Sequence, residues 1–256
     1  MTRYCITVSR SARIGSRVVR AAVFAASGLA LASSASAQAF RSDVLGHQVQ
    51  VEIMIEASNP EIVRLLAGMM ELRADVQLGL LAKHDGLPAT HINDARTIVW
   101  PEFREGLMAA GVADLDPLLQ KLDAASGPEA ITAAQAEIEG ALLKGRSAMK
   151  PTSADVLLAL HDLAKDAAAN HINQSGPTAV HDYQDAWAMI MAARGELDLL
   201  MRDPDPTIAK YATETALALD DLIISLPDPN QSAAVDIDPA LFNDLVARLE
   251  KMDQEA

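Results

Sequence analysis

The sequence has few of the residues and motifs that usually reveal a protein's chemistry. Only one of its 256 residues is cysteine, and only 4% are aromatic. A single cysteine excludes a disulfide framework, a multi-cysteine zinc or iron–sulfur site, and covalent c-type haem, which needs a C-x-x-C-H motif. The sequence also has no P-loop, H-E-x-x-H, G-x-S-x-G or EF-hand pattern. We therefore expect a protein that is not an enzyme.

Positive charge is also scarce. The chain has 21 Lys and Arg residues against 35 Asp and Glu residues, which gives a formal net charge of -14. Phosphate contacts need a surface rich in Lys and Arg, so we expect no nucleic-acid partner. An acidic surface attracts cations instead.

The first 37 residues have the organisation of a secretory signal peptide. Five arginines and no acidic residue precede or border the apolar run at 21–31, and small residues then form an A-x-A-like site that predicts cleavage after Ala37, with Ala39 as the alternative. The apolar run is too short to cross a hydrocarbon core about 30 Å thick at about 1.5 Å per residue. We therefore expect a periplasmic protein that is not inserted in the membrane after signal cleavage. Cleavage would also remove Cys5 and leave a cysteine-free chain, which suits an oxidising compartment.

The rest of the chain is rich in Ala, Leu, Glu and Met, which favour helices. Pro, Gly, Asn and Asp divide it into helical lengths. The predicted helices cover residues 60–86, 88–100, 114–125, 128–144, 153–175, 178–201, 206–226 and 239–252. Pro101 either kinks the second helix or begins a new one. Short loops between helices favour an all-α, up-and-down helical bundle.

The domain prediction follows from these elements. We expect a signal peptide at 1–37, an N-terminal arm at 38–58 and a helical bundle at 59–256. Within the arm, residues 49–56 alternate apolar and polar side chains with the period of a strand. A lone strand is unstable, so we interpret this segment as an extended arm or an irregular helix.

A faint internal repeat divides the bundle into halves at 59–150 and 151–256. The segments Gly86–His91 and Gly176–His181 share Gly, Ala and His at identical spacing. Either the chain contains two duplicated helical sub-bundles, or the match is chance in a sequence of biased composition.

The histidines point to a metal site. Each half has one histidine near the end of a helix (His84 and His171) and one near the start of the next (His91 and His181). Antiparallel helices joined by short turns would bring these ends together. Imidazoles with nearby carboxylates can bind iron, zinc or copper.

Carboxylates share helix faces with two of these histidines. His181 and Asp185 are four residues apart, and His91 and Asp94 are three apart. The best candidate ligands are His91, His181 and Asp185, followed by His84, His171 and Asp94. The alternative is structural, because acidic residues in a first turn stabilise the helix dipole and histidines there often cap or pack.

One segment carries a family resemblance. His181-Asp182-Tyr183-Gln184-Asp185-Ala186-Trp187, which follows a glycine-containing turn, resembles a segment of exported, all-helical proteobacterial proteins. These are distantly similar to the imelysin and EfeO/Algp7-type family of periplasmic bundles. The resemblance implies duplicated four-helix units and a role in iron uptake. The family's G-x-H-x-x-E marker is absent, so His181 and Asp185 would form at most a variant of its metal site.

The sequence therefore predicts a periplasmic protein that binds a metal ion for uptake or homeostasis, with iron as the first choice and zinc or copper next. The alternative is a metal-free scaffold or interaction module that binds another protein of the cell envelope.

Overall fold

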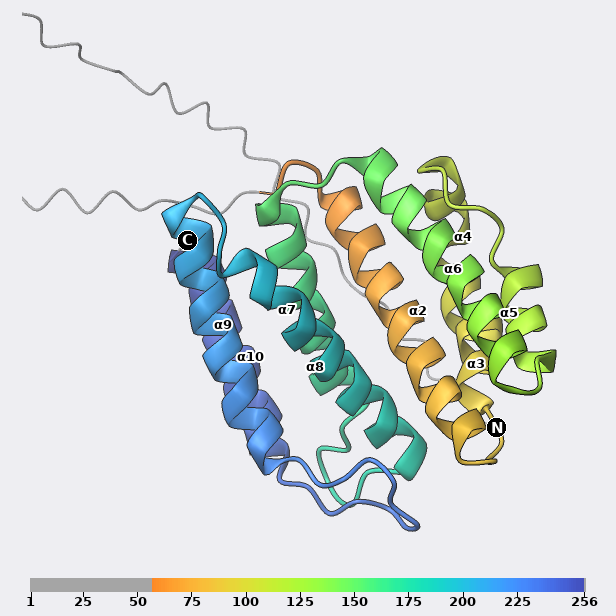
Figure 1. Cartoon of the computed structure of the whole chain (residues 1–256). Helices are drawn as coiled ribbons and strands as arrows, with labels where there is room; N and C mark the ends of the chain where they lie inside the picture. Colours follow the sequence, from red (N-terminus) through yellow and green to blue (C-terminus); the bar gives the residue numbers. More distant parts are fainter. Residues whose placement is uncertain (1–56, 256) are drawn as a thin grey trace, which may run out of the picture. The chain divides into compact units, whose positions relative to one another are not determined.

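The computed structural model describes residues 57–255, which form an all-α bundle (Figure 1). This confirms the fold class predicted from the sequence. The predicted signal peptide, the period-two segment at 49–56 and nearly all of the predicted arm lie outside the described residues. Within the described range, no helix is long and apolar enough to span a membrane.

The first described helix is α2, Pro60–His84. It begins where the sequence predicts, because the Asn59 side chain accepts a hydrogen bond from the Glu61 N–H and proline occupies the first turn. Just after its end, Gly86 has a φ of 71°, in the left-handed region that favours glycine. This turn reverses the chain towards the next helix.

The second predicted helix is longer than expected and contains a π-helical segment. Helix α3 (Thr90–Asp94), the π-helix η1 (Ala95–Val99) and α4 (Trp100–Ala109) follow one another directly. Pro101 has no N–H to donate within the helix, and just before it the Trp100 N–H bonds to the Ala95 carbonyl in the wider π pattern. The chain therefore stays helical through this proline.

The remaining helices match the predicted order. They are α5 (Asp116–Ala124), α6 (Pro128–Met149), α7 (Ser153–Asn170), α8 (Val180–Leu200), α9 (Pro206–Ser225) and α10 (Pro239–Glu255). A capping box begins α7, with Thr152 and Asp155 bonded to each other. Ser58 also donates two hydrogen bonds to Asp155, which ties the start of α2 to the start of α7.

Two hydrophobic clusters meet on α2, which lies between the two groups of helices in Figure 1. Leu65, Met69 and Leu72 pack into a cluster with α3 to α6. Leu66 and Met70 pack into a cluster with α7 to α10. Helix α2 therefore belongs to both cores.

Polar side chains lie where these two cores meet. Glu71 and Asp75 are four residues apart on α2, so they lie on one face, between its two apolar faces. The helices on either side of this junction supply the remaining residues of the candidate site.

Candidate metal centre

A close contact between α2 and α3 positions the first histidine. Gly79 allows this contact because a Cβ atom there would lie 2.3 Å from Cγ1 of Ile92. His91 precedes Ile92, and both side chains are buried. The imidazole of His91 therefore points into the junction between the two cores from a tightly packed helix.

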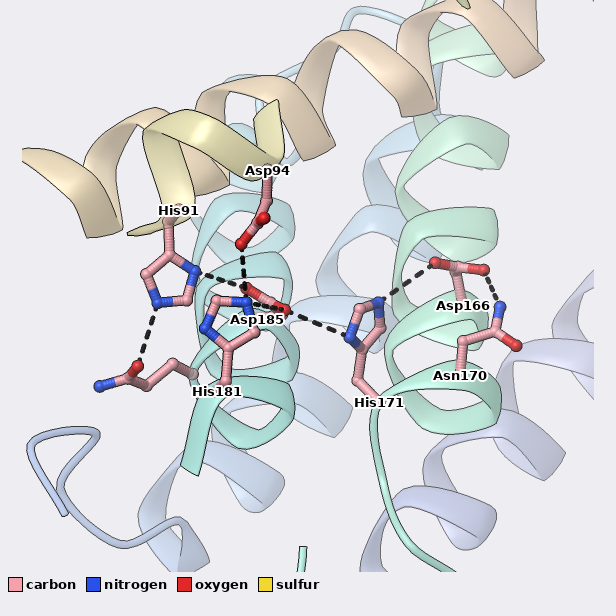
Figure 2. A network of polar contacts seen from close by, with 8 residues as sticks. His91, Asp94, Asp166, Asn170, His171, His181 and Asp185 are labelled. Atoms are coloured by element: carbon pink, nitrogen blue, oxygen red, sulfur yellow. Dashed lines mark hydrogen bonds and ion pairs between the residues drawn. The ribbon is translucent and has the colours of Figure 1, made fainter. Parts of the chain in front are cut away.

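The second half of the chain contributes three residues to the same place. His181 and Asp185 lie one turn apart near the start of α8, and His171 is the residue that ends α7. Figure 2 shows His181 and Asp185 facing His91 and Asp94 of α3, with His171 on the other side of Asp185. The structure thus brings together five of the six candidate ligands predicted from the sequence.

Asp185 is at the centre of the group. Its Oδ1 atom lies 2.9 Å from Nδ1 of His91. Its Oδ2 atom lies 3.6 Å from Nδ1 of His171 and 3.8 Å from Nε2 of His181. One carboxylate therefore faces three imidazoles (Figure 2).

Asp94 and ring stacking complete the arrangement. Oδ2 of Asp94 lies 2.8 Å from Nε2 of His181. The rings of His91 and His181 stack with their centroids 4.2 Å apart and their planes 11° from parallel. The two histidines at equivalent positions of the faint repeat are thus direct neighbours.

His84 is the one predicted ligand that the structure does not bring to this cluster. Its side chain is 87% exposed, and its Nδ1 lies 3.0 Å from Oδ1 of the adjacent Asp85. The turn around Gly86 leaves this last residue of α2 facing outward, while His91 faces inward.

The sequence analysis missed two acidic residues of α2. Asp75 is only 5% exposed, and ligand atoms of Asp75, His91 and Asp185 all lie within 4.8 Å of one another. Glu71 lies one turn earlier on the same face. The sequence did contain a signal for this pair. The two acidic residues are four positions apart on α2, and apolar residues border their face of the helix on either side.

No lysine or arginine among residues 57–255 pairs with the carboxyl groups of Glu71, Asp75, Asp94 and Asp185. Burial raises the pKa of Asp75 to about 9, and the carboxylates of Asp185, Glu71 and Asp94 add to this effect. Burial likewise raises the pKa of Glu71 to about 8, with further contributions from other carboxylates. Every charged group that shifts these two pKa values is acidic, so the cluster as a whole favours the uptake of positive charge.

Opposing effects act on His91. Burial alone would lower the pKa of its imidazole, but Asp185, Gln184 and Asp94 outweigh burial and raise that pKa above its usual value. The surrounding carboxylates therefore favour a positive charge at this position even though it is buried.

Two facing atoms of the cluster have no hydrogen bond. Nδ1 of His91 and Oδ1 of Asp185 are buried, and neither has a hydrogen-bond partner among residues 57–255. They lie 2.9 Å apart, so a protonated His91 would form an ion pair with Asp185, whereas in the neutral imidazole both atoms lack a partner. Buried polar atoms without partners destabilise the folded protein, so a ligand that bonds to both atoms would stabilise it.

A chain of hydrogen bonds determines which nitrogen of His91 is free. The amide nitrogen of Gln184 donates to the carbonyl oxygen of Pro229 over 3.1 Å. The amide oxygen of Gln184 therefore faces Nε2 of His91, 3.0 Å away, and must accept its proton. In the neutral imidazole this leaves the Nδ1 lone pair free to bind a metal, as in many metal sites with an outer hydrogen-bonded group.

The spacing of these atoms fits metal ligation. At metal–ligand distances of about 2.0–2.2 Å, neighbouring ligand atoms lie roughly 3.0 to 3.5 Å apart around an ion. The contacts of Asp185 and Asp94 with the three histidines span 2.8 to 3.8 Å. Small side-chain movements would bring these groups into a coordination shell of nitrogen and oxygen ligands, which suits iron and zinc.

A cavity lies on another side of α2. It has a volume of about 420 Å³ and lies between α2 and α8, with Met70, Trp187 and Met191 in its lining. Its two charged lining residues, Arg73 and Glu196, pair with each other at 3.0 Å. The cavity therefore contains no unpaired buried charge comparable to Asp75.

Comparisons of the chain with protein-family models, with curated proteins and with solved structures found no match.

Proposed function

We propose that this protein binds transition-metal ions through the cluster formed by His91, His181, Asp185 and Asp94, with His171 beside it. The observation that carries the proposal is the convergence of three imidazoles on a carboxylate whose buried Oδ1 has no hydrogen bond. Such a cluster destabilises the metal-free protein, and a bound cation removes this destabilisation.

Iron is the first choice of metal, and zinc or copper are next. The donor set of imidazole and carboxylate groups, without sulfur, supports iron or zinc ahead of soft Cu(I). The resemblance of the segment from His181 to Trp187 to exported bundle proteins supports a periplasmic role in iron uptake or homeostasis. We propose a binding protein and not an enzyme, located in the periplasm after removal of the signal peptide.

The alternative function, a metal-free interaction module, is supported by the cavity between α2 and α8 and by exposed apolar side chains such as Leu199. These features do not explain why acidic groups and histidines are gathered at the junction of the two cores. The metal-binding function therefore has the stronger support.

The direct test is titration of the purified, chelator-stripped protein with Fe²⁺ without oxygen, and with Zn²⁺ and Cu²⁺ in parallel. We expect tight binding to the wild type and a loss of at least about 100-fold in the double variant His91→Ala/His181→Ala. His161→Ala is the matched control, because His161 is a buried histidine outside the cluster. Unchanged affinity in the double variant, with a normal circular dichroism spectrum, would remove the assignment.

A further inference from the structure

We propose that the cluster holds two metal ions, bridged by the carboxylate of Asp185, with His91 and Asp75 on one ion and His181 and Asp94 on the other. This inference rests on the proposed metal-binding function and specifies how many ions the site takes.

The stacking of the two histidines is the first argument. The lone pair of an imidazole nitrogen lies in the plane of its ring, so a bound ion lies close to that plane. The rings of His91 and His181 are 11° from parallel, with centroids 4.2 Å apart. Their lone pairs therefore do not converge on one ion without rotation of a ring. Two ions about 3.5–4 Å apart, the separation found in two-metal sites, fit the stacked planes directly.

The orientation of Asp185 is the second argument. Its two oxygen atoms face different imidazoles, with Oδ1 towards His91 and Oδ2 towards His171 and His181 (Figure 2). A carboxylate that presents one oxygen to each of two groups of nitrogen ligands has the arrangement of a bridging ligand. A single ion would leave one of these oxygen atoms facing an imidazole without a metal between them.

Each half of the cluster has its own additional carboxylate. Asp94 lies against His181 at 2.8 Å, whereas Asp75 belongs to a group with His91 and Asp185 whose ligand atoms lie within 4.8 Å. Asp75 is 5% exposed, and its carboxyl group has no hydrogen bond or ion pair among the described residues. Ligand atoms of His91, Asp94 and His181 also lie within 4.8 Å of one another. Asp75 gives His91 a further carboxylate, apart from the one that contacts His181.

The test is to measure the number of ions bound and their magnetic coupling, with Mn²⁺ as the probe. We expect equilibrium dialysis of the stripped protein to give two Mn²⁺ per chain at saturation, and the electron paramagnetic resonance spectrum to show two exchange-coupled ions. The variants Asp75→Asn and Asp94→Asn should each bind one ion and give an uncoupled spectrum. The control His161→Ala should retain two coupled ions.

The outcomes separate this inference from the proposed function. One tightly bound Mn²⁺ that requires both His91 and His181 would overturn the two-ion centre and leave the metal-binding function standing. Two ions without magnetic coupling, or with Asp75→Asn still binding two, would also overturn it. No binding of Mn²⁺, Fe²⁺ or Zn²⁺ by the folded wild type would overturn both.

Discussion

Two buried histidines in this molecule meet a carboxylate, and their surroundings differ. His161 on α7 uses both ring nitrogens: Nδ1 contacts Asp253 at 2.7 Å and Nε2 contacts Thr215 at 2.9 Å. Lys165 pairs with the other oxygen of Asp253. Every polar atom of that network has a partner, and the lysine compensates the carboxylate.

Among the described residues, the network around His91 contains buried polar atoms without hydrogen bonds and has no lysine beside its carboxyl groups. Nδ1 of His91 and Oδ1 of Asp185 have no hydrogen bond, and carboxyl groups accumulate around them without a lysine or arginine that shifts the pKa of Asp75 or Glu71. The comparison teaches that a His–Asp contact alone is uninformative. Complete pairing indicates a structural role, and missing positive charge indicates a site for a cation.

The largest expected effect is on stability, at the paired network. His161→Ala should lower the free energy of unfolding by about 2–4 kcal/mol, because it leaves Asp253 and Thr215 without their buried partner. Urea unfolding measures this, and metal affinity should not change. His91→Ala should destabilise the metal-free protein far less while it weakens metal binding. Equal losses of stability in both variants would remove the distinction between the two networks.

The next effect concerns Gln184, the residue that holds the proton on Nε2 of His91. Gln184→Leu should weaken metal binding about 10–100-fold, the usual cost of losing an outer group that orients a ligand. Gln184→Glu keeps an acceptor for Nε2–H and should retain more of the affinity. Nitrogen NMR of the histidine rings should show a mixture of tautomers at His91 in the Leu variant only. A single unchanged tautomer there would contradict this role.

Asp75→Asn should stabilise the metal-free protein while it weakens metal binding. The pKa of Asp75 is raised to about 9, so the folded state holds a proton that the unfolded state loses above its usual pKa of 3.8. The wild type therefore loses stability as the pH rises from about 4 towards 9. The variant has no carboxyl group at this position, so it does not show this pH-dependent loss. We expect a gain of about 1–2 kcal/mol at pH 8 and almost none at pH 4, since removing an unpaired buried carboxyl relieves a penalty of this order. Thermal unfolding at the two pH values measures the gain, and a loss at pH 8 would refute it.

The smallest effect is the acid response of the paired network. Burial alone would raise the pKa of Asp253, but hydrogen bonds and charges from His161 and Lys165 outweigh it and lower that pKa below 3.8. This carboxylate contributes stability above the usual pKa, and the contribution is lost as the pH falls through the lowered value. Because Asp253 is partly exposed, we expect about 0.5–1 kcal/mol. Asp253→Asn should remove this contribution to the decrease in unfolding free energy between neutral and acidic pH. Asp253 makes the protein more stable as the pH rises, whereas Asp75 makes it less stable as the pH rises.

The helices could be predicted from the sequence because their signals are local. Asn59-Pro60, Thr152 and Asp238-Pro239 begin helices where capping and proline rules place them. The π-helix before Pro101 could not be predicted, because its widening depends on how α3 and α4 pack. The helix there continues through a proline that usually ends one.

Part of the candidate site was also accessible from the sequence. His91, His181 and Asp185 follow from the spacing of histidines and acids near helix starts. Asp75 and Glu71 were missed because their role depends on a tertiary contact between α2, α3 and α8. His84 shows the converse, since a position near the end of a helix does not determine which way the side chain faces.

In our proposal the cluster around His91 binds cations, and the paired network around His161 does not. The most direct measurement is a crystal structure of the Zn²⁺-soaked protein with anomalous diffraction at the zinc edge. We expect anomalous peaks between His91, His181 and Asp185, and none at His161. Peaks absent from that cluster, or present only beside Asp253, would contradict it.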